Sequence, residues 1–147
     1  TEGARTFLPV RLAGIWLQSD AWRLPSTGDV HPNARQFLSV DNQMSGRILG
    51  SWLPLTPADL KTTALQNARA ASAGARIVKE AWVRRDELDV LDLEIELPSG
   101  SLPHLLIGHY VTGAPGTVQL TILVPREVAE ARRGEIVAVF NSLLMWR

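Results

Sequence analysis

The stretch that decides the fold is residues 76–124, RIVKEAWVRRDELDVLDLEIELPSGSLPHLLIGHYVTGAPGTVQLTILV. Its clearest part is residues 89–97, DVLDLEIEL, in which leucine and isoleucine alternate with aspartate and glutamate. A period of two sends alternate side chains to opposite faces of a strand, whereas a helix would scatter both sets around its circumference. Residues 89–97 are therefore predicted to form a half-buried strand of an antiparallel sheet, with one dry and one solvated face.

Three further strands are predicted beside this one, at residues 76–84, 104–112 and 117–124. Short links rich in polar residues, glycine and proline join the four strands, as tight turns require. Parallel neighbours would need long crossover connections, so the four strands are predicted to form an antiparallel meander. If its first two strands pair as a hairpin, Lys79 faces outward beside Glu94.

The N-terminal third indicates additional, shorter strands. Residues 7–16 are apolar with weak alternation and predict a strand or an extended edge segment. Residues 19–32 contain two prolines, a glycine and small polar residues, and predict mostly loop. Residues 36–40 and 47–53 predict a hairpin, which brings the expected sheet to about six strands.

A first helix is predicted to begin at Thr56. This residue is a good N-cap, Pro57 suits the first helical position, and the carboxylate of Asp59 suits the positive end of the helix dipole. Leucine and alanine recur at helical spacing up to Gly74, a natural C-terminal stop. The alanine-rich face predicts that this helix lies close against the sheet.

A second helix is predicted to follow Pro125 and to run to about Leu144. Gly134 interrupts it, and a break or kink is expected there. The helix has an apolar stripe, formed by Val128, Ile136, Val139, Phe140 and Leu143. The order of elements predicts a single α+β domain over residues 1–147, an antiparallel sheet with both helices packed on the face that carries Leu91, Leu93 and Ile95.

Composition excludes several classes of function. The 147 residues carry 15 basic and 15 acidic side chains, without the basic excess that nucleic acids or anionic membranes attract. There is no cysteine, which excludes disulfides, thiolate chemistry and cysteine-ligated zinc. No apolar run is long enough to span a membrane. The sequence starts at Thr1 rather than at Met, so we expect a leader or lipid anchor upstream.

Candidate site residues are few. His104 and His109 are predicted to point to opposite faces of one strand, and His31 lies in a predicted loop, so no metal site is expected. No serine lies in a nucleophile elbow and no glycine-rich phosphate loop is present, so neither catalytic residues nor a cofactor are expected. Asp92 begins an acidic ladder that continues with Glu94 and Glu96.

This ladder admits two interpretations, a solvated face neutralised by Lys79 or a surface for a cation or a basic partner. Calcium needs a wrapped loop that a straight strand cannot supply, which favours the solvated face. The five tryptophans are the most unusual feature of the composition. Trp82 and most of the others are predicted to belong to the core, whereas Trp146 is a candidate interface residue. The candidate interaction surface is therefore Asp92, Glu94, Glu96 and Trp146.

The C-terminal two thirds resemble a known group. Residues 116–121, GTVQLT, are similar to the penultimate strand of the PsbP-like and DcrB-like α+β proteins, and residues 135–143, EIVAVFNSL, are similar to their last helix. The resemblance extends from Pro57 to Leu143 and is weaker before residue 54. It implies a protein that is not an enzyme, because members are generally subunits of photosynthetic complexes, bacterial envelope proteins and lipoproteins, or adaptor chaperones of secreted toxins.

Three functions are consistent with these observations. The first is a non-enzymatic binding or assembly module of the bacterial cell envelope, periplasmic or envelope-associated, with a protein partner. The second is a cytoplasmic adaptor chaperone, which predicts an uncovered apolar sheet face larger than a few hundred Å². The third is a small-ligand-binding or hydrolase-like domain, which predicts a pocket where titratable groups converge.

Overall fold

A computed structural model describes residues 4–25, 33–98, 100 and 102–145 of the chain. Two helices interrupt a series of strands, and a 3₁₀ turn precedes the second helix. The elements are, in order, β1 (Arg5–Pro9), β2 (Ala13–Gln18), β3 (Trp22–Arg23), β4 (Ala34–Ser39), β5 (Ser45–Ser51), α1 (Pro57–Ala71), β6 (Arg76–Arg85), β7 (Leu88–Leu97), β8 (His104–Gly113), β9 (Gly116–Pro125), the 3₁₀ turn Arg126–Val128, α2 (Ala129–Asn141) and β10 (Leu144–Met145).

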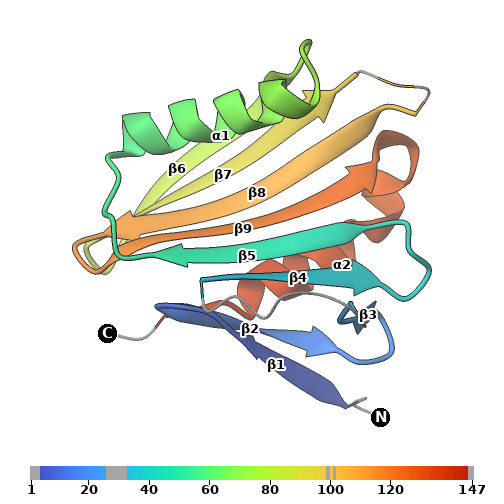
Figure 1. Ribbon diagram of the computed structural model, residues 1–147, viewed down its shortest axis with the longest axis horizontal. Helices are drawn as coiled ribbons and strands as arrows, with labels where there is room; N and C mark the ends of the chain where they lie inside the picture. Colours follow the sequence, from blue (N-terminus) through green and yellow to red (C-terminus); the bar gives the residue numbers. More distant parts are fainter. Residues whose placement is uncertain (1–3, 26–32, 99, 101, 146–147) are drawn as a thin grey trace.

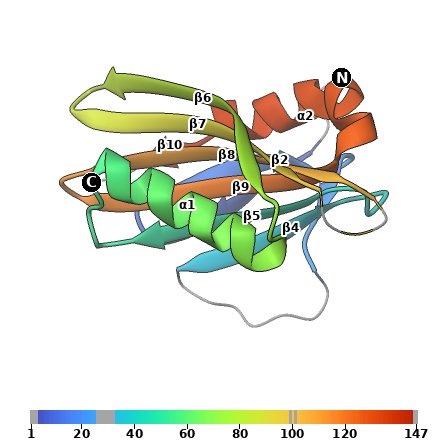
Figure 2. The ribbon, with the colours of Figure 1, turned by 90° about the horizontal axis from the view of Figure 1, so that it is seen from above.

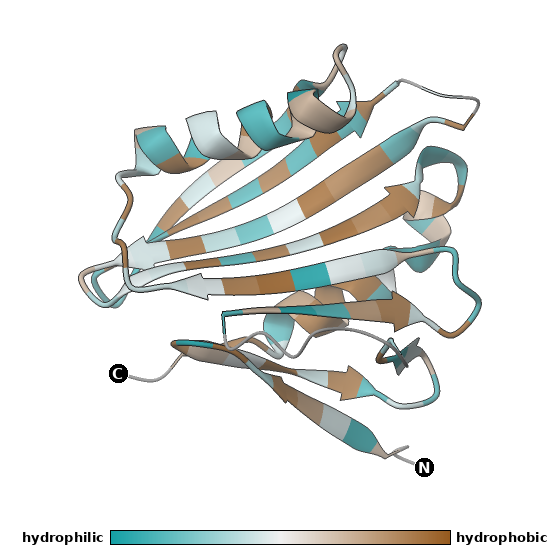
Figure 3. Cartoon of the chain, viewed as in Figure 1, coloured by the Kyte–Doolittle hydropathy of each residue, from teal (hydrophilic) through white to brown (hydrophobic). Residues whose placement is uncertain are grey.

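The larger of the two sheets has seven strands in the order β3-β4-β5-β9-β8-β7-β6, and every neighbouring pair is antiparallel (Figure 1). It contains the predicted four-stranded meander, β6 to β9, and the predicted hairpin, β4 and β5. Lys79 is paired with Glu94, as the alternation indicated. Bands of apolar and polar residues alternate along these strands (Figure 3), which is the pattern from which they were predicted.

The N-terminal segment differs from the expectation of one edge strand. It forms a hairpin, β1 and β2, and β10 pairs with the other side of β2 to complete a three-stranded sheet. The turn between β1 and β2 contains Leu12, whose φ is +73°, and Pro9 stands at the end of β1, where its missing N–H does least harm. The described residues thus hold ten strands rather than about six.

Helix α1 begins as predicted. The hydroxyl of Thr56 accepts a 3.1 Å hydrogen bond from the backbone N–H of Asp59, and Pro57 is the first helical residue. The helix ends at Ala71, three residues before Gly74, with Ser72 as its C-cap. The buried face of the helix consists of Leu60, Ala64 and Ala68. Because two of these three side chains are alanine, the helix lies close to β7.

Helix α2 runs without interruption through Gly134, where a break was expected. One glycine costs about 1 kcal/mol in a helix, and the buried Ile136 and Val139 that follow it hold the helix against the sheet. The helix ends at Asn141 rather than near Leu144. The Ser142 hydroxyl donates to the carbonyl of Val139 (2.6 Å) and accepts from the N–H of Trp16 (3.0 Å), so the chain leaves the helix and joins β2.

The α+β class and the packing of both helices against the sheet are confirmed, but the two helices lie on opposite faces (Figure 2). The leucines of β7 and Tyr110 form one core with α1. The opposite face, which carries Ile107, Leu120 and Ile122, forms a second core with α2 and the small sheet. Apolar residues project from both faces of β8 and β9, so one helix layer cannot cover them.

Most tryptophans are not core residues, contrary to expectation. Trp22 is buried, whereas Trp16, Trp52 and Trp82 are between 36% and 60% exposed. Trp82 shares the face of Leu91 but lies on β6, the edge strand, beyond the cover of α1. Val78, on the same strand, falls at a β-bulge and is 47% exposed. Among the described helices, none is both long and apolar enough to cross a membrane.

Candidate functional site

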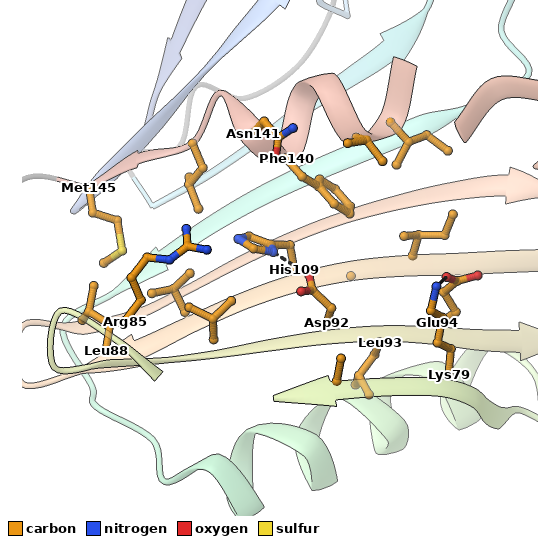
Figure 4. A pocket seen from close by; sticks show the side chains of 18 of the residues that line it. Lys79, Arg85, Leu88, Asp92, Leu93, Glu94, His109, Phe140, Asn141 and Met145 are labelled. Carbon is orange, nitrogen blue, oxygen red and sulfur yellow. Dashed lines mark hydrogen bonds and ion pairs between the residues drawn. The ribbon is translucent and has the colours of Figure 1, made fainter. Parts of the chain in front are cut away.

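A pocket of about 700 Å³ lies between α2 and the β6–β8 end of the sheet (Figure 4). On this face the small sheet and α2 form a core with β4, β5, β9 and β8, and the described residues of β6 and β7 do not belong to that core. Its floor is formed by β6, β7 and β8, and its roof by α2 and the segment after it. The main lining side chains are Lys79, Ala81, Arg85, Asp86, Leu88, Val90, Asp92, Glu94, Ile107, His109, Val111, Arg133, Ile136, Val137, Phe140, Asn141, Leu143 and Met145.

One end of the pocket is closed by a charged cluster. The guanidinium of Arg133 donates two hydrogen bonds of 3.1 Å to the carboxylate of Glu94, and the Nζ of Lys79 lies 3.6 Å from the same carboxylate. Arg133 also donates to Glu130, one helical turn before it. These carboxylates raise the pKa of Arg133 above its ordinary value, Glu94 contributing most. The cluster fixes the orientation of α2 on the sheet.

The middle of the pocket contains an imidazole and a carboxylate. The Nδ1 of His109 lies 2.6 Å from the Oδ1 of Asp92 on the neighbouring strand. Because a carboxylate only accepts, Nδ1 carries the hydrogen and Nε2 is left to face the pocket. The ring of Phe140 stacks on the imidazole with 5.6 Å between centroids. The His109 side chain is therefore held in one orientation by a hydrogen bond and an aromatic contact.

The other end of the pocket lies beside the β6–β7 turn. Arg85 is the last residue of β6, and Figure 4 shows its side chain extended into the pocket on the side of His109. Apolar side chains surround this end, with Leu88 below and Met145 above. Asn141 contributes an amide from the C-terminus of α2. This end of the pocket is thus apolar apart from a guanidinium, an amide and the exposed Asp86.

The predicted acidic ladder is divided by the structure. Asp92 and Glu94 both line the pocket, whereas Glu96 lies outside the lining and pairs with Arg76 and Arg126 at 3.4 Å each. The ladder was expected to be solvated, but Glu94 is only 9% exposed, because α2 packs over the face that carries it. Trp146, the fourth candidate, lies outside the described residues.

The histidines are separated as predicted. His104 points to the face opposite His109, and its Nδ1 lies 2.8 Å from the carbonyl oxygen of Leu102. His31 lies outside the described residues. Within the part of the chain that the structure describes, no three His, Cys, Asp or Glu side chains gather in a way that could hold a metal ion.

Three residues that shape the site were not predicted as site residues from the sequence: Arg85, Arg133 and Phe140. Arg133 and Phe140 project from a helix whose side of the sheet was predicted wrongly, so their partners were not foreseeable. Arg85 was assigned to a turn and is the last residue of a strand. The contact between Asp92 and His109 did have a signal, because strands that end at residue 97 and begin at residue 104 pair these two residues directly.

Comparisons with known proteins support the fold. No protein-family model and no curated protein matches this chain. Among solved structures, cyanobacterial PsbP (CyanoP) from Synechocystis matches with a TM-score of 0.73 and 12% identity, over 98% of this chain and 94% of that one. A protein of unknown function from Pseudomonas aeruginosa matches with a TM-score of 0.58 and 16% identity, over 99% of each chain.

A weaker match is LpqN of Mycobacterium tuberculosis, which is involved in cell envelope biogenesis. Its TM-score is 0.49 at 12% identity, over 100% of this chain and 87% of that one, and it carries no argument about this chain. Identities this low are informative about architecture alone. The chain therefore has the α+β fold of the PsbP-like proteins, as the patterns in its penultimate strand and last helix indicated.

Proposed function

We propose that this chain is a non-enzymatic binding module of the bacterial cell envelope, and that it binds a small ligand in the pocket under α2. The observation that carries the proposal is the pocket itself. Its volume of about 700 Å³ falls in the range of small-molecule sites, roughly 300–1,000 Å³, and such sites combine apolar walls with a few placed polar groups. A protein partner, expected from the sequence, would call for a broad and flat surface instead.

The location in the envelope rests on the resemblance to the PsbP-like and DcrB-like group, many of whose bacterial members are envelope proteins or lipoproteins. Fractionation of the native host tests it, with an antibody against this chain. Recovery in the periplasmic or membrane fraction is the expected result. Recovery in the cytoplasm alone would contradict the envelope location and leave the pocket unaffected.

The adaptor-chaperone alternative receives less support. It requires a broad apolar face of the sheet that nothing covers. In the described ranges, the apolar side chains of β7, β8 and β9 are buried or partly buried on both faces of the sheet, against α1 on one side and against α2 and the small sheet on the other. A secreted protein's apolar helix would therefore have to displace an element of this fold.

The proposal of binding without catalysis rests on the residues around His109. Among the described lining residues there is no serine, threonine or cysteine that this imidazole could activate. One observation favours a second candidate, a hydrolase-like domain, because an imidazole oriented by a carboxylate can activate water. Hydrolysis of p-nitrophenyl esters that disappears in His109→Gln would support that candidate, and absence of turnover would support binding.

The binding site is tested with N-phenyl-1-naphthylamine, a neutral apolar molecule that fluoresces when it leaves water. Wild-type protein should bind this probe with one saturable site. Ala81→Trp places a large ring in the pocket from the exposed edge strand β6, and Val137→Trp does so from the half-exposed roof. Each variant should weaken probe binding at least tenfold.

The matched control is Gln66→Trp, which adds the same ring at an exposed position of α1, on the opposite face of the sheet. It should bind the probe as the wild type does. If the wild type fails to bind the probe, or if both pocket variants with unchanged thermal unfolding bind it normally, the pocket is not a ligand site and the proposed function is wrong.

A further inference from the structure

Some of the charged side chains that line the pocket have a partner of opposite charge, and others do not. Glu94 is paired with Arg133 and Lys79, and Asp92 with His109. The side chains of Arg85 and Asp86 have no hydrogen-bond or ion-pair partner among the residues that the structure describes. A guanidinium without a protein partner, placed at the edge of an apolar cavity, is a ready partner for a ligand's anion.

The two unpaired charges are not equivalent. Asp86 belongs to the exposed β6–β7 turn, where water screens its carboxylate. Arg85 is longer, and Figure 4 shows it extended from the strand end into the pocket, on the side of His109 and below α2. Arg85 is also exposed, so a ligand that covers its guanidinium would exclude water from the ion pair and strengthen it.

Apolar side chains continue from Arg85 along the length of the pocket. Val90 and Val111 are paired on the floor strands β7 and β8, and Phe140 and Leu143 line the pocket from α2 and the segment after it. The charged cluster of Arg133 and its partners closes the far end. A molecule that fits this arrangement has a charged group at one end and an uncharged apolar body that reaches inward.

We infer that the ligand is an amphiphile with a single anionic head group, held by Arg85, and with an apolar tail that lies between the floor and Phe140. This inference rests on the proposed function, since it assigns the chemistry of the molecule that occupies the same pocket. The side-chain NH₂ of Asn141 lines the same pocket and can donate a further hydrogen bond to the head group. A carboxylate and a phosphate share the required charge.

Competition against N-phenyl-1-naphthylamine tests the inference with four compounds of equal chain length: decanoate, decyl phosphate, decan-1-ol and decylammonium. Both anions should displace the probe at concentrations at least tenfold lower than the alcohol, and decylammonium should be the weakest. The order of decanoate and decyl phosphate distinguishes a carboxylate ligand from a phosphate ligand.

Arg85→Gln retains a polar side chain without the charge, and it should abolish the preference for the anions while probe binding persists. The matched control is Arg84→Gln, on the adjacent residue of β6, whose side chain points to the other face and pairs with Asp89 at 3.2 Å. That variant should keep the preference. Equal displacement by decanoate and decan-1-ol, stronger displacement by decylammonium, or an unchanged preference in Arg85→Gln would overturn the inference. Probe binding would still stand in each of these cases, so the proposed function would survive.

Discussion

The guanidinium of Arg133 and the carboxylate of Glu94 meet in a two-pronged contact, with 3.1 Å from each terminal nitrogen to its oxygen. This contact joins the middle of α2 to the middle of β7, residues that are 39 positions apart. It explains why Glu94, the middle residue of the acidic ladder that was predicted to be solvated, is buried. The carboxylate is not exposed to water because a helix supplies its counter-charge.

Removing Arg133 should therefore cost more than removing an ordinary surface arginine. In Arg133→Ala the Glu94 carboxylate stays largely buried and keeps only Lys79 nearby, 3.6 Å away. We expect a loss of about 2 kcal/mol in the free energy of unfolding, between the values for exposed and buried pairs. Urea denaturation measures it, since urea does not screen charges.

The control for this prediction is Arg76→Ala. Arg76 pairs with Glu96 at 3.4 Å, but its side chain is 68% exposed, and an exposed pair contributes about 1 kcal/mol or less. Equal losses in the two variants would show that the Arg133 contact is no stronger than a surface pair. The double variant Arg133→Ala with Glu94→Gln should recover part of the loss, because the unpaired charge is then gone.

Gly134 should be replaceable with a gain in stability. A Cβ added at this position meets no other atom within 4 Å. In the interior of a helix, alanine is more favourable than glycine by about 1 kcal/mol. Gly134→Ala should therefore raise the free energy of unfolding by roughly that amount, measured by urea denaturation. A loss of stability would indicate that α2 departs from regular helical geometry at Gly134, as the break or kink predicted from the sequence requires.

Gly50 should respond in the opposite way. A Cβ at Gly50 would overlap the backbone carbonyl oxygen of Arg11, in the turn between β1 and β2. This close approach brings the turn between β1 and β2 against the C-terminal end of β5. Gly50→Ala should destabilise the protein by about 2 kcal/mol or more, since backbone atoms cannot move aside as a flexible side chain can. A neutral result would show that the two sheets separate without cost.

The face of the sheet that each helix covers could not be predicted from the sequence. Alternation in residues 89–97 predicted β7 correctly, yet it led to both helices being placed on the leucine face. The contrary signal was in β8, where Leu105, Leu106 and Ile107 are consecutive apolar residues. A continuous apolar run is typical of a strand that is covered on both faces. Which helix covers which face depends on tertiary packing that no local period encodes.

The site residues on the strands could be predicted from the sequence, whereas the contacts made by α2 could not. Asp92 was singled out, and its contact with His109 follows from the hairpin register of β7 and β8. Phe140 was assigned to an apolar stripe, but its stacking on His109 depends on how α2 crosses the sheet. Trp82 was assigned to the core because of its size, and it is exposed because β6 is the last strand of the sheet.

The β6–β7 turn offers a stabilising substitution. Asp86 and Glu87 have φ values of +50° and +66°, the conformation of the two central residues of a type I′ hairpin turn. A residue with a Cβ pays about 1 kcal/mol or more in this conformation, and glycine does not. Glu87→Gly should raise the free energy of unfolding by about 1 kcal/mol in urea denaturation. Glu87→Ala removes the charge but keeps the Cβ, and it should give no such gain.

The turn between β4 and β5 should make stability depend on acid pH. The Asp41 carboxylate accepts from the Ser39 hydroxyl (2.7 Å), the Gln43 N–H (3.2 Å) and Arg132 (2.8 Å), and these contacts, Ser39 first, lower its pKa to about 2. An aspartate in an unfolded chain has a pKa of about 3.9. The folded state therefore favours the ionised form, and this contribution is complete above pH 4 and is lost as the pH falls toward 2.

Asp41→Asn should thus be less stable than the wild type at neutral pH, and the difference should shrink between pH 4 and pH 2. Thermal unfolding at a series of pH values measures both curves. Asp20→Asn is the control, because Asp20 is exposed and its carboxylate has no partner among the described residues. Its curve should follow that of the wild type throughout. A constant gap between wild type and Asp41→Asn down to pH 2 would mean that the contacts of Asp41 do not depend on its charge.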